Sequence, residues 1–254
     1  MYINSQYVGI RHVEEVIGKD VVERANKRYG VVLKLDSKAS DIFDKSRFKV
    51  VDNSYWKQRD SRLLNQSFSM LEAVKSRPEL SKVYFDQKKW GRYIGIMDAY
   101  QTLHGTLPKN VRFYLNPLTG LIEPMFFDGH LDRWHRNTRI VDIATKYLTY
   151  DDCNTNLRGS QHAVNLCSNL GWYRTLFGYG YKINSDFYIS YFNALEGISS
   201  DAFINQELKE LWDDFSFIRG SLYKEFWRAD EFFQFGLTPY VSSLTAIKER
   251  LRKI

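Results

Sequence analysis

Residues 104–130 read HGTLPKNVRFYLNPLTGLIEPMFFDGH, and this stretch decides much of the fold. It contains two runs of aromatic and branched residues, VRFYL and LIEPMFF, separated by the turn sequence NPLTG. Pro117 near the start of the turn and Gly120 at its end suit a tight connection, so the pattern predicts a β-hairpin. Pro124 has no N–H to donate to a ladder, which predicts that the second strand lies at a sheet edge or is bulged there.

The hairpin should bring two polar residues together. Asn110 stands just before the first strand and Asp128 just after the second. Antiparallel neighbours lie about 4.8 Å apart, so the two side chains should converge at the open end of the hairpin, beside His104. Amide and carboxylate oxygens are ligands that Mg²⁺ accepts together with water and substrate phosphates. The spacing is compatible with a magnesium site, but by itself it favours the ordinary use of Asn and Asp as turn and cap residues.

Two helices are predicted ahead of the hairpin. Residues 61–77 have apolar side chains near helical spacing and stop before Pro78. Residues 86–103 form the firmer helical pattern, with an apolar face made by Trp90, Tyr93, Ile94, Met97 and Tyr100. Residues 37–60 are polar and irregular, which favours a loop with a short strand at FKVV (48–51).

The first 35 residues predict a strand, a helix and a second strand. A short apolar alternation opens the chain, and valines among charged residues follow it. Asp20 has the side chain of a helix N-cap, and Gly30 is the residue type that favours a helix C-cap. The branched residues of VVLKL (31–35) suit a pleated surface.

Composition and charge narrow the class of protein. The chain has 254 residues, a net charge of +6 and 44% hydrophobic residues, as in ordinary folded domains. Aromatic residues make up 16% of it, which predicts an aromatic core. No window approaches the roughly 18 apolar residues of a membrane span, and the N-terminus lacks the pattern of a signal peptide. No basic cluster is interleaved with stacking residues, so nucleic acid is not an expected partner. Residues after 132 are expected to be mostly helical, which gives an α+β protein.

Residues 104–130 resemble the CotH kinase family, which is named for a spore-coat protein. The matching residues are Asn110, Arg112, Phe113, Tyr114, Asn116, Pro117, Thr119, Gly120, Glu123, Pro124 and Asp128. The N-terminal YINSQYVGIRHVEE is similar to a segment of the family's N-lobe, with Asn4 and Gly9 leading to the acidic pair Glu14 and Glu15. The resemblance covers about residues 2–35 and 90–134 in detail.

The resemblance implies a kinase-like fold and a phosphotransferase activity. Residues 1–254 would form one domain, with a partial N-lobe over 1–60 and a helical C-lobe over 61–254 that carries the hairpin. The expected reaction transfers the γ-phosphoryl group of ATP to a hydroxyl of a protein or peptide, with Mg²⁺ as cofactor. In such chemistry the site mainly positions the nucleotide and neutralises charge on the transferring group.

The resemblance also suggests roles for individual residues. Asp128 would be the principal magnesium ligand, and Asn110 the second ligand at the end of the catalytic loop. Glu14 and Glu15 would face the nucleotide, one of them pairing with a lysine that holds phosphate oxygens. Lys34 is a candidate for that lysine.

The identity of the catalytic base stays open at the level of the sequence. HGTLPKN has Thr106 where a related phosphotransferase loop places Asp. Asp98, at the edge of the predicted apolar helix face, is either the base or a solvated helix charge. His104 is the other candidate, because the reference pKa of histidine, about 6.5, suits proton transfer at neutral pH. It could equally cap the preceding helix.

A rival interpretation is a catalytically inactive structural or interaction protein of the same fold, such as a coat or surface component. The family's N-lobe usually begins further upstream with a lysine-bearing strand, so the chain is expected to be either a fragment or a binding module. A small-molecule phosphotransferase is the third hypothesis. The resemblance is compatible with a cell-envelope, spore-coat or extracellular setting, and a cytoplasmic one stays open.

Three further patterns carry less weight. Asp128, His130 and Asp132 alternate and could bind a transition metal, although Asp128 alone is the preferred ligand. The spacing of Cys153, His162 and Cys167 is too wide for a zinc knuckle, and the two cysteines need not be bonded. Arg133, Arg136 and Arg139 could line a site for an acidic group or could form an exposed helix face.

Overall fold

A computed structural model describes residues 2–7, 17–36, 47–100, 102–107, 109–128 and 185–225, together with residues 245 and 249. The chain divides into two compact units. One comprises residues 1–16 and 196–254, and the other residues 17–195. The second unit holds the sheet, the hairpin and the helices that pack against them.

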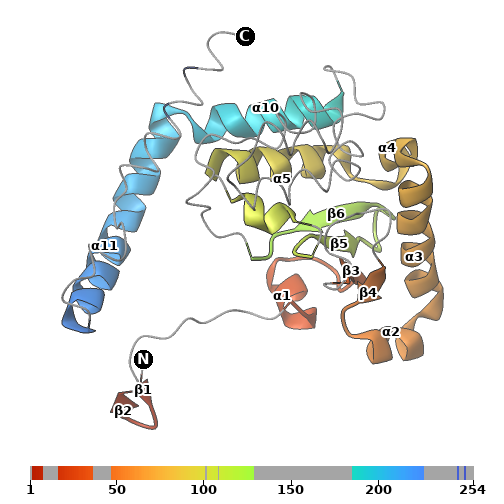
Figure 1. Cartoon of the computed structure of the whole chain (residues 1–254), viewed down its shortest axis with the longest axis horizontal. Coiled ribbons are helices and arrows are strands. Elements are labelled where there is room, and N and C mark those ends of the chain that lie inside the picture. Colours follow the sequence, from red (N-terminus) through yellow and green to blue (C-terminus); the bar gives the residue numbers. More distant parts are fainter. Residues whose placement is uncertain are drawn as a thin grey trace, which may run out of the picture. The chain divides into compact units, whose positions relative to one another are not determined.

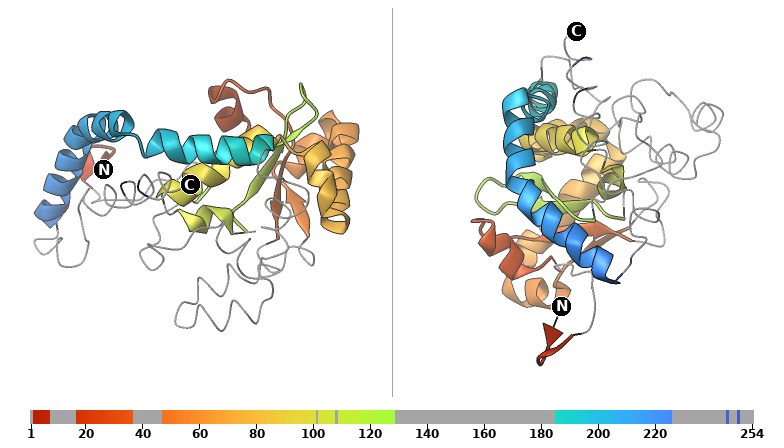
Figure 2. Two further views of the ribbon diagram at one scale, coloured as in Figure 1. Left: turned by 90° about the horizontal axis from the view of Figure 1, so that it is seen from above. Right: turned by 90° about the vertical axis from the view of Figure 1, so that its left-hand side faces the viewer.

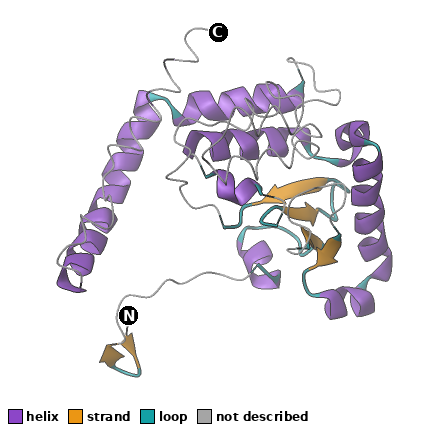
Figure 3. Cartoon of the chain, in the orientation of Figure 1, coloured by secondary structure: helices purple, strands orange, loops and turns teal. Residues whose placement is uncertain are grey.

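The centre of the second unit is a four-stranded antiparallel sheet with the order β4-β3-β5-β6 (Figures 1 and 3). Its strands are β3 (Val32–Leu35), β4 (Phe48–Val50), β5 (Arg112–Leu115) and β6 (Ile122–Met125). The predicted hairpin is confirmed as β5 and β6, and Gly120 has a φ of 69° at the end of its turn. Pro124 lies on edge strand β6, as its missing N–H requires. The α+β class expected from the sequence is confirmed.

The two faces of the sheet are both covered, which explains the aromatic composition. On one face Phe113 is the centre of an aromatic group: its ring lies 5.7 Å from Phe48, 5.7 Å from Trp90 and 6.3 Å from Phe85. On the other face the apolar cluster comprises Ile17, Val22, Val32 and Tyr114. Rings at these spacings add about 0.5–1.5 kcal/mol per pair beyond their burial.

The helices of this unit are α1 (Lys19–Arg24), α2 (Asn53–Arg59), α3 (Ser61–Ser76), η3 (Pro78–Leu80), α4 (Ser81–Tyr84), α5 (Gln87–Tyr100) and η4 (Leu103–Thr106). Two of them, α3 and α5, lie where the sequence pattern predicts them, whereas α2 falls within residues 37–60, for which the sequence predicts a loop with a short strand. The prediction of a helix that stops before Pro78 is confirmed by α3, whose N-cap Asp60 accepts a hydrogen bond from the Leu63 amide at 2.9 Å. The helix predicted over 86–103 ends at Tyr100, and the separate 3₁₀ turn η4 follows it.

Helix α10 (Asp186–Ile198) runs along α5 (Figures 1 and 2). Two glycines of α5 make this close approach possible. A Cβ at Gly91 would overlap the Phe187 carbonyl, and one at Gly95 would lie 2.7 Å from the carbonyl oxygen of Tyr191. The Tyr191 hydroxyl donates to Asp98 at 2.8 Å across the same interface.

The N-terminal block differs from its prediction in three places. Asn4 and Ser5, with φ of 48° and 65°, turn the expected first strand into a small hairpin of β1 (Tyr2–Ile3) and β2 (Gln6–Tyr7). Asp20 lies inside the first turn of α1, whose N-cap is Gly18. Gly30 is not a C-cap, because α1 ends at Arg24. Gly30 is instead required by packing, since a Cβ there would overlap the Leu115 carbonyl.

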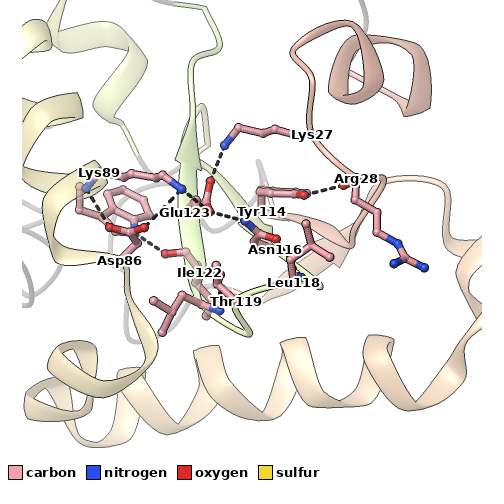
Figure 4. A network of polar contacts seen from close by, with 12 residues as sticks. Lys27, Arg28, Asp86, Lys89, Tyr114, Asn116, Leu118, Thr119, Ile122 and Glu123 are labelled. Carbon is pink, nitrogen blue, oxygen red and sulfur yellow. Dashed lines mark hydrogen bonds and ion pairs between the residues drawn. The ribbon is translucent and has the colours of Figure 1, made fainter.

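The buried carboxylate of Glu123 connects the hairpin to neighbouring segments through hydrogen bonds (Figure 4). Glu123 of β6 is fully buried and accepts hydrogen bonds from Lys27, from Lys89 at 2.6 Å and from the Asn116 amide at 2.7 Å. Lys27 follows α1 and Lys89 lies on α5, so a single side chain links three segments. Burial alone would raise the pKa of Glu123, but the hydrogen bonds from Lys27, Lys89 and Asn116 hold it below its ordinary value.

The first unit contains the β1–β2 hairpin and α11 (Asp201–Glu225). Among the helices that the structure describes, none is both long enough and apolar enough to cross a membrane. The predicted boundary at residue 60 falls between α2 and α3, and the central sheet takes strands from both sides of it.

Candidate functional site

Three predicted residues come together at the open end of the hairpin. The Nε2 atom of His104 lies 3.2 Å from Oδ2 of Asp128, and the Asn110 amide nitrogen donates to the His104 carbonyl at 2.9 Å. The His104 side chain is 12% exposed and that of Asp128 is 38% exposed. The site is therefore partly open to solvent on the Asp128 side.

The η4 turn places His104, and two hydrogen bonds hold that turn. Asn110 binds the carbonyl of His104, and the buried Tyr93 hydroxyl donates to the carbonyl of Gly105 at 3.1 Å. Burial strongly raises the pKa of Tyr93, against the smaller opposing effect of the Arg112 charge. Tyr93 therefore stays a neutral hydrogen-bond donor, and His104 sits on a supported backbone.

Asp128 has an unusual backbone. Its φ of 49° lies in the left-handed region, where a Cβ is disfavoured and where Asp and Asn are the better tolerated residue types. The sharp change of direction turns the chain after β6 and presents the carboxylate beside His104. Strained positions of this kind often occur at functional sites.

Asp98 lies elsewhere. It is fully buried on α5 and accepts the hydrogen bond from Tyr191 of α10, so it is not a solvated helix charge. The hydrogen bond between Tyr191 and Asp98 joins α10 to α5. Thr106 is also fully buried.

Lys34 lies in a row of cationic residues on one face of the sheet. Its Cα partners are Lys49 on β4 and Arg112 on β5. Lys34 therefore lies on β3, the strand that pairs directly with β5 of the hairpin. Glu14 and Glu15, predicted to face the nucleotide, lie outside the described residues, so the structure does not place them.

Several other predicted groups also lie outside the described residues. They are His130, Asp132, the arginines at 133, 136 and 139, and the set Cys153, His162 and Cys167. In the part of the chain that the structure describes, no three His, Cys, Asp or Glu side chains cluster as a metal site.

The donor set at the hairpin end nevertheless suits a hard cation. Asp128 offers carboxylate oxygens, and Asn110 spends its amide nitrogen on the His104 carbonyl, which leaves the amide oxygen as its second polar atom. Mg²⁺ commonly takes one or two protein oxygens and completes its shell with water and phosphate. Asp128 and Asn110 are therefore the residues of this site that could hold a magnesium ion.

Sequence reasoning missed the contacts that Arg112 makes beside this site. Arg112 packs over the ring of Phe127, with its Cζ 3.9 Å from the ring centroid. The alternation of side chains along a strand puts Arg112 on the same face as Tyr114, a buried face. An arginine at a buried strand position could have signalled a specific partner, because arginine is rarely buried without one.

No family model matches the chain, and neither the curated proteins nor the solved structures that were compared with it gave a match.

Proposed function

We propose that this chain is a CotH-like phosphotransferase of kinase-like fold, which transfers the γ-phosphoryl group of ATP to a protein or peptide hydroxyl. The observation that carries the proposal is the meeting of His104, Asn110 and Asp128 at the open end of the hairpin. A hairpin flanked by Asn and Asp is the layout by which kinase-like enzymes hold magnesium on a nucleotide.

In this proposal Asp128 and Asn110 hold the Mg²⁺ of the nucleotide. The bound cation would neutralise charge on the phosphates and on the transferring group. Lys34 would bind phosphate oxygens from the neighbouring strand, and Glu14 or Glu15 would act on the nucleotide side. The kinase-like lobes, with residues 1–60 as the partial N-lobe, belong to the same proposal.

Of the two candidate bases, the geometry favours His104. It lies beside Asp128, whereas the Asp98 carboxylate is buried between α5 and α10 with the Tyr191 hydroxyl on it. In the proposed step His104 would accept the proton of the acceptor hydroxyl as that oxygen attacks the γ-phosphorus, while the bond from the γ-phosphorus to the β–γ bridging oxygen breaks and ADP leaves. Neutral imidazole is a suitable base near pH 7.

The alternative is an inactive structural or interaction protein of the same fold. The specific observation in its favour is that the loop ahead of Asn110 offers no accessible carboxylate: residue 106 is a threonine, and the Asp98 carboxylate is fully buried. In that case the chain would transfer no phosphoryl group, whether or not the hairpin end binds a metal–nucleotide complex.

The test is thermal unfolding of the purified chain with and without millimolar Mg·ATP, for the wild type and for Asp128→Ala and Asn110→Ala. A ligand at a hundredfold excess over its dissociation constant stabilises the folded state by about 2.7 kcal/mol. Glu79→Ala is the matched control, because Glu79 is an exposed carboxylate on η3.

A shift of the wild type and of Glu79→Ala, but not of Asp128→Ala, supports the metal–nucleotide site. Transfer of label from γ-labelled ATP to a peptide library, lost in His104→Gln, then supports the phosphotransferase. If Mg·ATP stabilises the wild type but neither the wild type nor any variant transfers the label, the inactive protein is favoured. If Mg·ATP shifts the unfolding of the wild type and of Asp128→Ala by the same amount, the proposed metal–nucleotide site is wrong.

A further inference from the structure

We propose that Arg112 is a positioning residue: it fastens the two flanks of the hairpin to each other, and so sets the arrangement of Asn110, Asp128 and His104. Its importance for catalysis rests on the proposed function. Its effect on the geometry of the hairpin end can be measured independently.

The ladder of the hairpin does not reach the site. The last paired residues at the open end are Arg112 and Met125, whereas Asn110 lies two residues before that pair and Asp128 three residues after it. Backbone pairing between β5 and β6 therefore cannot by itself set the separation of Asn110 and Asp128. A side-chain contact has to extend the connection.

The guanidinium of Arg112 makes that contact on the Asn110 side. Its Nη1 atom donates to the carbonyl of Lys109 at 2.9 Å and more weakly to that of Val111 at 3.3 Å. These two residues flank Asn110 in the chain. The hydrogen bonds therefore hold the backbone on both sides of the proposed ligand.

On the other flank the same guanidinium lies over the ring of Phe127, at 3.9 Å from Cζ to the ring centroid. Phe127 immediately precedes Asp128 and packs against the apolar cluster of Ile17, Val22 and their neighbours. Stacking of a planar cation on an aromatic face is favourable, most of all where water is excluded. Arg112 is 6% exposed, so this contact is largely desolvated.

Support of this kind matters because Asp128 occupies the left-handed region, which costs free energy in a residue with a Cβ. A fixed Phe127 limits the backbone conformations open to the next residue. Arginine suits the position better than lysine, because a flat guanidinium can donate in its plane while its face stacks on a ring. Lysine could keep the charge but not both contacts.

The test needs one readout of geometry and one of metal binding. The chain has five histidines, so the ring signal of His104 can be assigned in ¹⁵N-histidine-labelled protein by comparison with His104→Gln. Mn²⁺ alone, detected by electron paramagnetic resonance, serves as the metal probe. The variants are Arg112→Met, Arg112→Lys and Phe127→Leu. Lys49→Met is the control, because it removes one positive charge from the same row of the sheet without touching the hairpin flanks.

Arg112→Met and Phe127→Leu should move the His104 ring signal and weaken Mn²⁺ binding about tenfold or more, as loss of supporting contacts around metal ligands commonly does. The double variant Arg112→Met/Phe127→Leu should be little worse than Arg112→Met alone, because Arg112→Met already removes the contact between the guanidinium and the ring. Arg112→Lys should not restore the wild-type signal, and Lys49→Met should leave both readouts unchanged. If Arg112→Met does not fold, Phe127→Leu and Arg112→Lys carry the comparison.

An unchanged His104 signal in the folded Arg112 and Phe127 variants overturns the positioning role, whatever happens to Mn²⁺. A moved signal upholds it. If the signal moves but the wild type and Asp128→Asn bind Mn²⁺ equally, the positioning role stands and the proposed metal site is wrong. The two failures are therefore distinguishable.

Discussion

Replacing Glu123 tests how the hairpin is attached to the rest of the sheet unit. Glu123→Leu removes a fully buried carboxylate that accepts hydrogen bonds from Lys27, Lys89 and Asn116. Leucine has a similar size but offers no acceptor, so Lys27 and the Asn116 amide lose their bond to Glu123, and Lys89 keeps only its ion pair with Asp86 at 3.4 Å. We expect the protein to fold but with a lower free energy of unfolding.

The size of the loss follows from the exposure of the partners. Removing one member of a buried ion pair typically costs about 3–5 kcal/mol. The side chains of Lys27 and Lys89 are 32% and 47% exposed, so both ammonium groups can turn towards water and recover part of this cost. We therefore expect about 3 kcal/mol for Glu123→Leu. Glu123→Gln, which keeps one oxygen acceptor, should cost less, about 2 kcal/mol.

The assay is urea unfolding followed by tryptophan fluorescence, because Trp90 is fully buried beside the hairpin and donates to the carbonyl of Ile122 at 2.9 Å. Lys27→Met and Lys89→Met should each cost about 1 kcal/mol, and in a double-mutant cycle each should lose its effect when Glu123 is already leucine. Glu79→Ala, an exposed carboxylate on η3, should have no effect.

The same carboxylate predicts a dependence on pH. Burial acts to raise the pKa of Glu123, but its three hydrogen-bond donors lower it below the ordinary value of about 4.5. The unfolded state therefore binds more protons than the folded state in the mildly acidic range. The contribution of Glu123 to stability is complete above that value and is lost as the pH falls through the lower, folded-state pKa. Glu123→Gln should lack this component of the acid dependence.

A cost below about 1 kcal/mol for Glu123→Leu, with full acid sensitivity retained, would refute the reasoning. It would show that apolar packing around the hairpin, and not the carboxylate, holds β6 against α5 and the segment after α1.

Three further predictions concern the packing of the same unit. Tyr191→Phe removes the hydroxyl that donates to the buried Asp98, and should cost about 1–3 kcal/mol in urea unfolding; a neutral result would mean that another donor replaces it. Gly95→Ala places a Cβ 2.7 Å from a carbonyl oxygen of α10 and should cost about 1–3 kcal/mol, whereas an exposed Gly197→Ala should not destabilise. Trp90→Phe leaves the Ile122 carbonyl without the indole donor, so it should lower the midpoint of thermal unfolding; an unchanged midpoint would contradict the importance of that hydrogen bond.

Much of the fold could be predicted from local chemistry. The turn sequence NPLTG, with Pro117 and Gly120, predicts the hairpin, and Pro124 places its second strand at an edge. Pro78 predicts the end of α3. These features depend on backbone restrictions of single residues, which act wherever the residue occurs.

Other features escaped prediction because they depend on distant segments. Gly30 resembles a helix C-cap in sequence, but it is required by the carbonyl of Leu115, a residue 85 positions later in the chain. Asp98 resembles a surface charge on an amphipathic helix until α10 covers it. The Asn4–Ser5 turn was missed because neither residue is a glycine, although both adopt positive φ.

For the candidate site, the sequence alone determined which residues flank the two strands at the open end of the hairpin. Antiparallel pairing of these strands follows from the turn and the two apolar runs. The sequence therefore predicted that Asn110 and Asp128 would be close, with His104 beside them. Tertiary structure alone decided how they are held: the η4 turn, the left-handed backbone of Asp128, and the contact of Arg112 with Lys109 and Phe127. The physical reason is that pairing and turn formation are local preferences, whereas the orientation of side chains beyond the ladder depends on which groups the folded chain packs against them.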